Sequence, residues 1–165
     1  MKLIIASIVV FSLVILFLFA LFPADISVSR VVQINCNASQ VNAKIADLRR
    51  WKTWNELVTA GSSNDSSSLT AVKFDAAHIR LNGMNIALLK SSTDSILTRW
   101  EYGQKSFTGS FILTEMNGRI ILEWTLRFHL GWYPWNKLAG MFYDKQLGPL
   151  MEGSLLKLQK ELETE

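Results

Sequence analysis

Few side chains in this sequence are of the types that perform acid–base, nucleophilic or metal chemistry. His78 and His129 are the only histidines, and neither has a sequence neighbour that would complete a catalytic triad or a metal pair. We therefore expect both to lie in loops or to face solvent. Glu123 and Arg127 form the best ionisable pair, because they share one face of a predicted strand. They either orient the polar head of a ligand or face water, and we favour the second role.

The sequence also lacks the short motifs that announce a known chemistry. It contains no P-loop, dinucleotide-binding fingerprint, zinc-ligand spacing or nucleophile elbow. Its single cysteine, Cys36, excludes an internal disulfide and a cysteine-based zinc site, and we expect it to be a small core residue. We predict no catalytic residue, no metal ligand and no cofactor.

Large aromatic side chains are the stronger candidates for a functional surface. They occupy inward positions of the predicted strands and of a predicted C-terminal helix. They either contact an apolar ligand or simply fill the core that a domain of about 140 residues needs. For any single residue, core filling is the more common outcome. Together with Glu123 and Arg127, the predicted ligand-binding residues are Trp100, Phe111, Trp124, Phe128 and Phe142.

The elements that would position these residues follow an apolar N-terminal segment. Residues 3–22 carry no charge, and Pro23 follows them. A helix of this length covers about 30 Å, the thickness of the hydrocarbon core of a bilayer. We therefore predict a single transmembrane anchor over residues 1–23 and one folded domain over residues 24–165.

The alternative for this segment is a cleaved signal peptide. The apolar stretch is longer than the usual signal core of about 7–15 residues, which favours the anchor. Lys2 and the terminal amine precede the span, whereas Arg30 follows it. The short N-terminal flank favours a domain on the non-cytoplasmic, periplasmic side.

The positive charge of the chain is dispersed. The formal net charge is +3, and only Arg49, Arg50 and Lys52 form a basic cluster. A solvated helix end near anionic lipid headgroups accounts for this cluster as well as nucleic acid would. We expect no nucleic-acid partner.

Hydrophobic periodicity outlines the domain. Residues 26–36 alternate as a strand, Val41, Ile45 and Leu48 have helical spacing, and residues 50–57 form a second helical piece. The polar run 61–68 predicts a loop. Further strands are expected at residues 69–74, 84–90, 95–102, 105–115 and 119–128.

Asn117-Gly118 is the strongest hairpin signal and joins the last two strands. The alternation in these strands predicts one buried and one solvent-exposed face, and hence an antiparallel sheet. From Leu138 onward the period is helical, and Gly148-Pro149 either kinks or splits that helix. The element order is typical of an α+β domain whose C-terminal helix covers the apolar face of the sheet.

Several of these segments carry a recognisable pattern. The matching residues are the strand 30–35, the helix end 45–48, the paired tryptophans Trp51 and Trp54, and the C-terminal stretches 141–149 and 153–158. In these residues the chain resembles the START-like helix-grip superfamily, and within it the polyketide-cyclase-type SRPBCC proteins that carry an N-terminal membrane helix. The resemblance covers the two ends of the domain better than its middle.

The resemblance implies a sheet wrapped around a long C-terminal helix, with a cavity that relatives use for apolar ligands. We therefore expect a membrane-anchored domain that binds a hydrophobic small molecule or lipid without transforming it. The alternatives are a cyclase- or hydrolase-like enzyme, and a protein-interaction module like the relatives that stimulate a chaperone ATPase. The cluster 132–135 either contacts the membrane or gates the pocket, or else wedges the hairpin against the helix.

Overall fold

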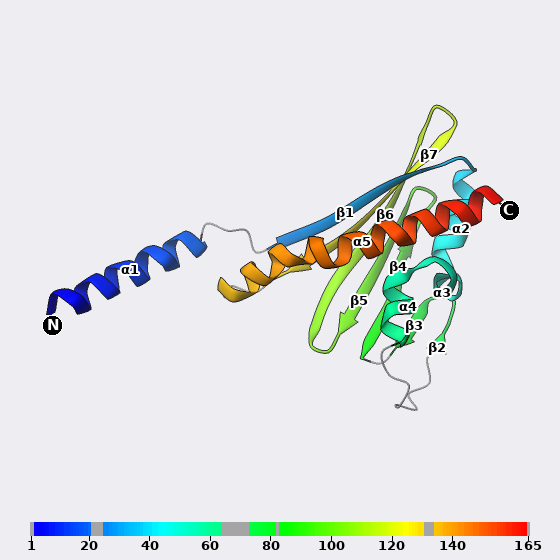
Figure 1. Ribbon diagram of the computed structural model, residues 1–165. Helices are drawn as coiled ribbons and strands as arrows, with labels where there is room; N and C mark the ends of the chain where they lie inside the picture. The colour runs from blue at the N-terminus through cyan, green and yellow to red at the C-terminus, as the bar shows by residue number, and fades with distance from the viewer. Residues whose placement is uncertain (1, 21–24, 64–72, 82, 131–133, 165) are drawn as a thin grey trace.

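One antiparallel sheet of seven strands organises the domain (Figure 1). The computed structural model describes residues 2–20, 25–63, 73–81, 83–130 and 134–164, without the side chains of residues 2, 3, 6, 18–20, 61–63 and 134–141. The strand order is β1-β7-β6-β5-β4-β3-β2, and every neighbouring pair is antiparallel. The strands are β1 Asp25–Ile34, β2 Lys73–Phe74, β3 His78–Leu81, β4 Met84–Ser91, β5 Ser95–Tyr102, β6 Lys105–Met116 and β7 Arg119–His129.

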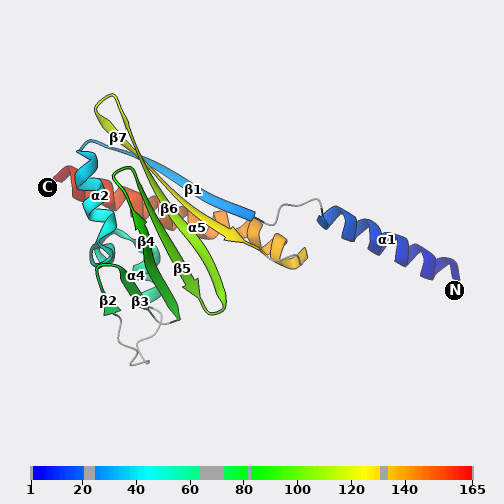
Figure 2. The ribbon, with the colours of Figure 1, turned by 180° about the vertical axis from the view of Figure 1, so that it is seen from behind.

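The described helices that pack on this sheet cover one of its faces, which we call the inner face. The long helix α5 lies across it in Figure 1, whereas the view from behind in Figure 2 shows the opposite, outer face in front of α5. The helices are α1 Lys2–Ala20, α2 Ala38–Ala46, a 3-10 turn Leu48–Arg50, α3 Trp51–Trp54, α4 Glu56–Ser63 and α5 Pro134–Thr164. The predicted α+β architecture, an antiparallel sheet with a C-terminal helix on its apolar face, is confirmed.

The hairpin between β6 and β7 forms as the sequence predicts. Asn117 and Gly118 have φ angles of 53° and 74°, the positive values that a tight two-residue turn requires. Register then places Phe111 opposite Trp124 and Leu113 opposite Leu122. All four side chains are buried on the inner face. Alternation along the strands therefore identified the buried face correctly.

Helix α5 is continuous from Pro134 to Thr164, so of the two alternatives at Gly148-Pro149, a kink or a split, the split does not occur. Pro149 lies inside the helix, where it lacks the N–H that would bond to the preceding turn. Gly148 has a different role, since a Cβ there would collide with the guanidinium of Arg30. Arg30 extends from β1 past this glycine and pairs with Asp144 at 2.9 Å. The glycine thus leaves room for the guanidinium of Arg30 against α5.

Other local predictions need correction. The predicted loop 61–68 is helical over its first three residues, since α4 extends to Ser63, and its remainder lies outside the described residues. Of the predicted strand 69–74, only Lys73 and Phe74 are described, as β2. The strand β3 was not predicted, because a run of only four residues gives too weak an alternation to detect.

The N-terminal segment forms the helix α1, whose described apolar side chains are exposed, from Ile15 at 36% to Phe11 at 67%. In the part of the chain that the structure describes, no helix meets the combined length and apolarity needed to cross a bilayer.

Candidate functional site

The space between the inner face and the helices is solidly packed at one end. Trp51 and Trp54 enter it from α3 and meet Phe111 of β6 and Trp124 of β7. All four side chains are fully buried, and the rings of Phe111 and Trp124 stack with centroids 5.1 Å apart. We call these four residues the filled end. Here the aromatic side chains form a core.

The other end of the same space is empty. A cavity of about 760 Å³ lies between the sheet and α5, at the end of the sheet where β5 turns into β6. We call this region the hollow end. Its lining is Leu57, Met84, Trp100, Tyr102, Gln104, Lys105, Ser106, Phe107, Leu126, Phe128, His129, Leu130, Tyr143, Gln146 and Leu147.

A chain of aromatic rings forms the wall of this cavity. Trp100 stacks on Phe107 at a centroid distance of 5.7 Å, and Phe107 contacts Phe128 at 4.6 Å. Phe128 in turn contacts Tyr143 of α5 at 4.9 Å. The first three lie on adjacent strands because Phe107 is paired with Trp100 on one side and with Phe128 on the other. The wall is therefore a product of strand register.

Gly109 holds the indole of Trp100 in place. The indole Nε1 donates to Thr98 Oγ1 at 3.0 Å, and that hydroxyl donates to the Gly109 carbonyl at 3.0 Å. A Cβ at position 109 would lie 2.7 Å from both Thr98 Oγ1 and Trp100 Nε1. Only glycine leaves space for this arrangement, which satisfies the indole N–H and turns the apolar ring toward the cavity.

Polar groups are confined to the rim of the cavity. Tyr102, Gln104, Lys105, Ser106 and Gln146 line it, and all five are exposed. The deeper lining is apolar and aromatic. An elongated ligand with one polar end fits this distribution, since its apolar body would leave water while its head kept polar partners.

The structure divides the aromatic residues proposed from the sequence. Trp100 and Phe128 line the cavity. Phe111 and Trp124 belong to the filled end and do not line it. Phe142 is 58% exposed on α5 and lies outside the cavity lining as well.

The polar pair proposed from the sequence lies on the outer face of the sheet. Glu123 accepts a hydrogen bond of 3.1 Å from Thr125, whose hydroxyl is 2.6 Å from that of Ser29. Arg127 is exposed. Because Trp124, Leu126 and Phe128 point inward, the residues that alternate with them point away from the cavity. The pair therefore has no access to a ligand inside.

His129 does have a partner, which sequence spacing could not reveal. Register pairs it with Asp25, and Nδ1 of His129 lies 2.7 Å from Oδ1 of Asp25. Both side chains are more than 70% exposed. This hydrogen-bonded pair lies on solvent-facing positions of β7 and β1, and His129 borders the cavity.

Sequence reasoning missed several of the residues that line the cavity. Phe107 shares the alternation of Phe111 on β6, which was a signal that was available. Tyr143 and Leu147 are one helical turn apart, so their shared orientation on α5 was a signal that was available. Leu57 and Met84 had no such signal, because they come from α4 and β4.

Within the described residues no group of three His, Cys, Asp or Glu side chains is arranged to hold a metal ion. Cys36 does not line the cavity. Partial burial, and the nearby carboxylate of Glu163, raise the pKa of its thiol. A thiol with a raised pKa is a poor nucleophile at neutral pH.

The chain is similar to one described protein family and to several solved structures. The sequence pattern of the family described as "Polyketide cyclase / dehydrase and lipid transport" matches residues 25–163. No curated protein matches the sequence.

Solved structures with similar folds include three of distinct origin. DynU16, from the dynemicin biosynthetic locus, is 18% identical with a TM-score of 0.55, over 84% of this chain and 47% of DynU16. A START superfamily protein from Mycobacterium smegmatis is 15% identical with a TM-score of 0.54, over 84% of this chain and 97% of that protein. The di-domain ARO/CYC StfQ from the steffimycin pathway is 8% identical with a TM-score of 0.59, over 86% of this chain and 52% of StfQ. This chain thus spans about half the length of DynU16 and StfQ. At such low identities these similarities establish the fold alone.

Proposed function

Because the chain belongs to the polyketide cyclase/dehydrase and lipid transport family, we propose that it binds a hydrophobic small molecule or lipid in the hollow end without transforming it. The observation that carries the proposal is the cavity of about 760 Å³ with an aromatic wall and a polar rim. This volume lies within the range of about 300–1,000 Å³ that is typical of small-molecule sites. The resemblance to START-like proteins in the sequence agrees with the family assignment.

The proposed ligand has an apolar body and one polar end. Burying an apolar body against Trp100, Phe107 and Phe128 would contribute about 25 cal/mol for each Å² removed from water. The polar end would remain at the rim, within reach of Lys105 and Gln146. A fatty acyl chain and a fused-ring polyketide both satisfy these requirements.

We further propose that residues 3–22 anchor the domain in a membrane as a single span. The support is the uncharged sequence of this segment and the exposure of its described side chains in α1. An anchor would keep the cavity close to a bilayer from which apolar ligands are drawn. We place the domain on the non-cytoplasmic side because of the short N-terminal flank.

The binding proposal is tested by extracting ligand from the purified full chain and identifying it by mass spectrometry. Leu147→Trp places a large ring in the cavity and should abolish co-purification of the ligand. Leu156→Trp is the matched control, because Leu156 is on the same helix and 53% exposed. A full chain that carries no apolar ligand and binds no added fatty acid or polycyclic aromatic probe would overturn the proposal.

The anchor is tested by alkaline extraction of membranes from cells that express the chain. The full chain should remain in the membrane pellet, and a variant lacking residues 2–22 should be released. The mass of the mature protein tests the alternative. A mass that lacks the first two dozen residues would identify a cleaved signal peptide and would contradict the anchor.

One observation favours a second candidate, an enzyme of the cyclase or dehydrase kind. Tyr102, Lys105 and Tyr143 all line the cavity, and each can donate a hydrogen bond to a carbonyl group of a bound ligand. The extracted ligand distinguishes the two candidates. If it is chemically altered on incubation with fresh protein, and Lys105→Met prevents this change, the chain is an enzyme and the non-catalytic proposal is wrong.

A further inference from the structure

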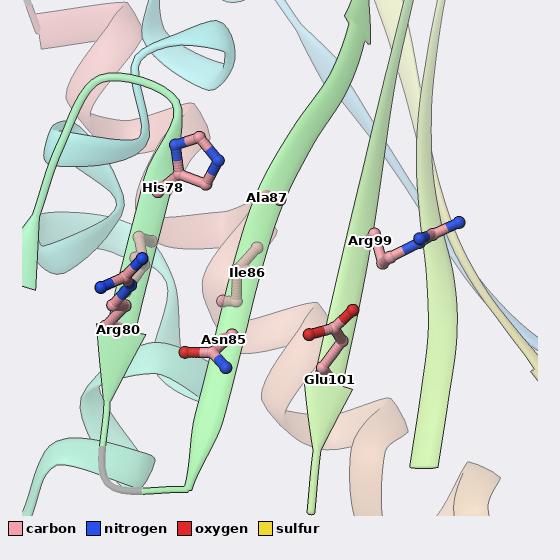
Figure 3. A pocket seen from close by; sticks show the side chains of 8 residues that line it. His78, Arg80, Asn85, Ile86, Ala87, Arg99 and Glu101 are labelled. Atoms are coloured by element: carbon pink, nitrogen blue, oxygen red, sulfur yellow. The ribbon is translucent and has the colours of Figure 1, made fainter. Parts of the chain in front are cut away.

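A second hollow lies on the outer face of the sheet, separate from the ligand cavity. Its volume is about 390 Å³, and it crosses β3, β4 and β5. The small side chain of Ala87 lies in the middle, between taller polar side chains (Figure 3). We call this region the outer groove. Its polar lining is His78, Arg80, Asn85, Arg99 and Glu101.

Strand register sorts these polar groups along the groove. Arg80 of β3 is paired with Asn85 of β4, and Asn85 is paired with Glu101 of β5. One row thus runs from a cation through an amide to a carboxylate. In the next row Ala87 is flanked by His78 and Arg99. The groove therefore has a cationic end over β3 and an anionic group over β5.

The cationic end contains more positive charge than the protein neutralises. Lys73 of β2 is directly opposite Arg80. Like charges in directly opposite positions of a sheet destabilise it. Over the described part of the chain, neither Lys73 nor Arg80 forms an ion pair or a side-chain hydrogen bond. An oxyanion between them would relieve the repulsion.

The other end of the groove presents an acceptor without a donor. Glu101 has no side-chain partner among the described residues, although Arg99 shares its strand and its face. Figure 3 shows the guanidinium of Arg99 turned away from β4, while the carboxylate of Glu101 remains beside the groove. Glu101 is thus free to accept hydrogen bonds from a ligand.

We propose that the outer groove binds a zwitterionic phosphate ester, in which a short chain joins a phosphate group to a primary ammonium group. The phosphate lies against Arg80, at the end of the groove next to Lys73 of the neighbouring strand, and the His78 ring and the Asn85 amide are further donors to its oxygens. The ammonium group donates to Glu101. The backbones of β3 and β5 are two strand spacings apart, about 10 Å, and the side chains of Arg80 and Glu101 shorten this gap to the length of such a ligand.

Two sources present this chemistry, free phosphoethanolamine and the headgroup of phosphatidylethanolamine. For the free ligand, the full chain in neutral detergent micelles is titrated with O-phosphoethanolamine and with inorganic phosphate by calorimetry. The chain should bind O-phosphoethanolamine more tightly than phosphate. Arg80→Gln should weaken the binding of both by about tenfold or more, because a charge-assisted contact is lost.

Glu101→Gln should weaken the binding of O-phosphoethanolamine and leave that of inorganic phosphate unchanged. Arg119→Gln and Glu115→Gln are matched controls, since both residues are exposed near the tip of the β6–β7 hairpin. Neither control should alter binding. Equal binding by all variants would overturn the proposal, and so would a Glu101→Gln protein that keeps its preference for O-phosphoethanolamine.

The headgroup source is tested by native mass spectrometry of the full chain in mixed micelles. Phosphatidylethanolamine should bind and phosphatidylcholine should not, because the quaternary ammonium of choline has no N–H to donate to Glu101. Binding of the lipid alone identifies the headgroup as the source, and binding of the free ester alone identifies a soluble ligand. Binding of neither overturns the proposal. The Leu147→Trp variant should bind as the wild type does, which separates the outer groove from the cavity.

Discussion

The filled end and the hollow end lie on the same face of the same sheet, and they differ in what covers them. At the filled end, α3 inserts Trp51 and Trp54 against Phe111 and Trp124. At the hollow end, α5 contributes Tyr143 and Leu147, and about 760 Å³ stays empty. Both ends have strands with equally strong alternation. The difference teaches that an apolar strand face becomes a core or a binding site according to the helix that covers it.

The division between the two ends predicts unequal costs of mutation. A residue surrounded by other side chains loses both its transfer free energy and the contacts around the space it leaves. A residue that already borders a cavity loses mainly its transfer free energy. Four substitutions test this contrast.

Trp124→Ala at the filled end should have the largest effect. Trp124 is 0% exposed and contacts Trp54, Trp100 and Phe111. We expect the free energy of unfolding to fall by about 3–5 kcal/mol, measured by urea denaturation. Trp124→Phe is the control. In the described structure the indole N–H of Trp124 has no acceptor, so the loss of that group removes no hydrogen bond. If the two variants are equally unstable, the filled end is not packed as described.

Gly109→Ala, at the boundary between the two ends, should have the next largest effect. The added methyl group collides with Thr98 and Trp100 and disturbs the hydrogen bonds that join them. We expect a loss of about 2–3 kcal/mol in the free energy of unfolding, together with weaker ligand binding. Thr114→Ala, at an exposed site on the same strand, should change stability by less than about 0.5 kcal/mol. A Gly109→Ala protein as stable as this control would contradict the close approach.

Phe128→Ala at the hollow end should cost less stability than Trp124→Ala. One side of its ring borders the cavity, so we expect a loss of about 2 kcal/mol, close to the transfer free energy alone. Ligand binding should fall much more than stability does, because the variant interrupts the aromatic wall between Phe107 and Tyr143. Urea denaturation and ligand titration of the same samples measure both effects. A loss as large as that of Trp124→Ala would mean that the two ends are packed alike.

Asp47→Asn should have the smallest effect, and it acts on the filled end from outside. Asp47 caps the turn that leads into α3, and its carboxylate accepts from the backbone N–H and the guanidinium of Arg49. These hydrogen bonds lower the pKa of Asp47. Because the pKa of Asp47 is lower in the folded state than in the unfolded state, its ionised carboxylate stabilises the folded state at pH values above about 4, the ordinary aspartate pKa. This stabilisation is lost as the pH falls from that value through the lowered pKa.

We therefore expect Asp47→Asn to reduce the free energy of unfolding by about half a kcal/mol at pH 7, the usual scale for an exposed pair. The difference from wild type should shrink below pH 4. Urea denaturation at pH 7 and at pH 3 measures it. A difference that is equal at both values would mean that the charge of Asp47 does not contribute.

Local sequence was sufficient to predict the structure of a segment where one physical rule dominated. Alternation placed Phe111, Leu122 and Trp124 on the buried face, because burial of a strand face enforces a period of two. Asn117-Gly118 specified its turn, because few residue pairs tolerate two successive positive φ angles. The same kind of reasoning left a kink and a split open at Gly148-Pro149, and only the structure shows that α5 is continuous there.

The candidate site was only partly accessible to such reasoning. Trp100 and Phe128 were proposed and line the cavity, whereas Phe111 and Trp124, equally aromatic and equally inward, do not. Glu123 and Arg127 share a strand face, but only the completed sheet shows that this face is the outer one.

What the sequence determined by itself was local: the extended or helical state of most segments, the turn at Asn117-Gly118, and the face each strand buries. These follow from backbone sterics and from the hydrophobic effect acting on neighbouring residues. The tertiary structure alone decided that α3 fills one end of the inner face and leaves the other hollow. It also brought Arg80, Asn85 and Glu101 to one groove from three strands. Strand register and helix placement depend on contacts distant in sequence, which no local pattern records.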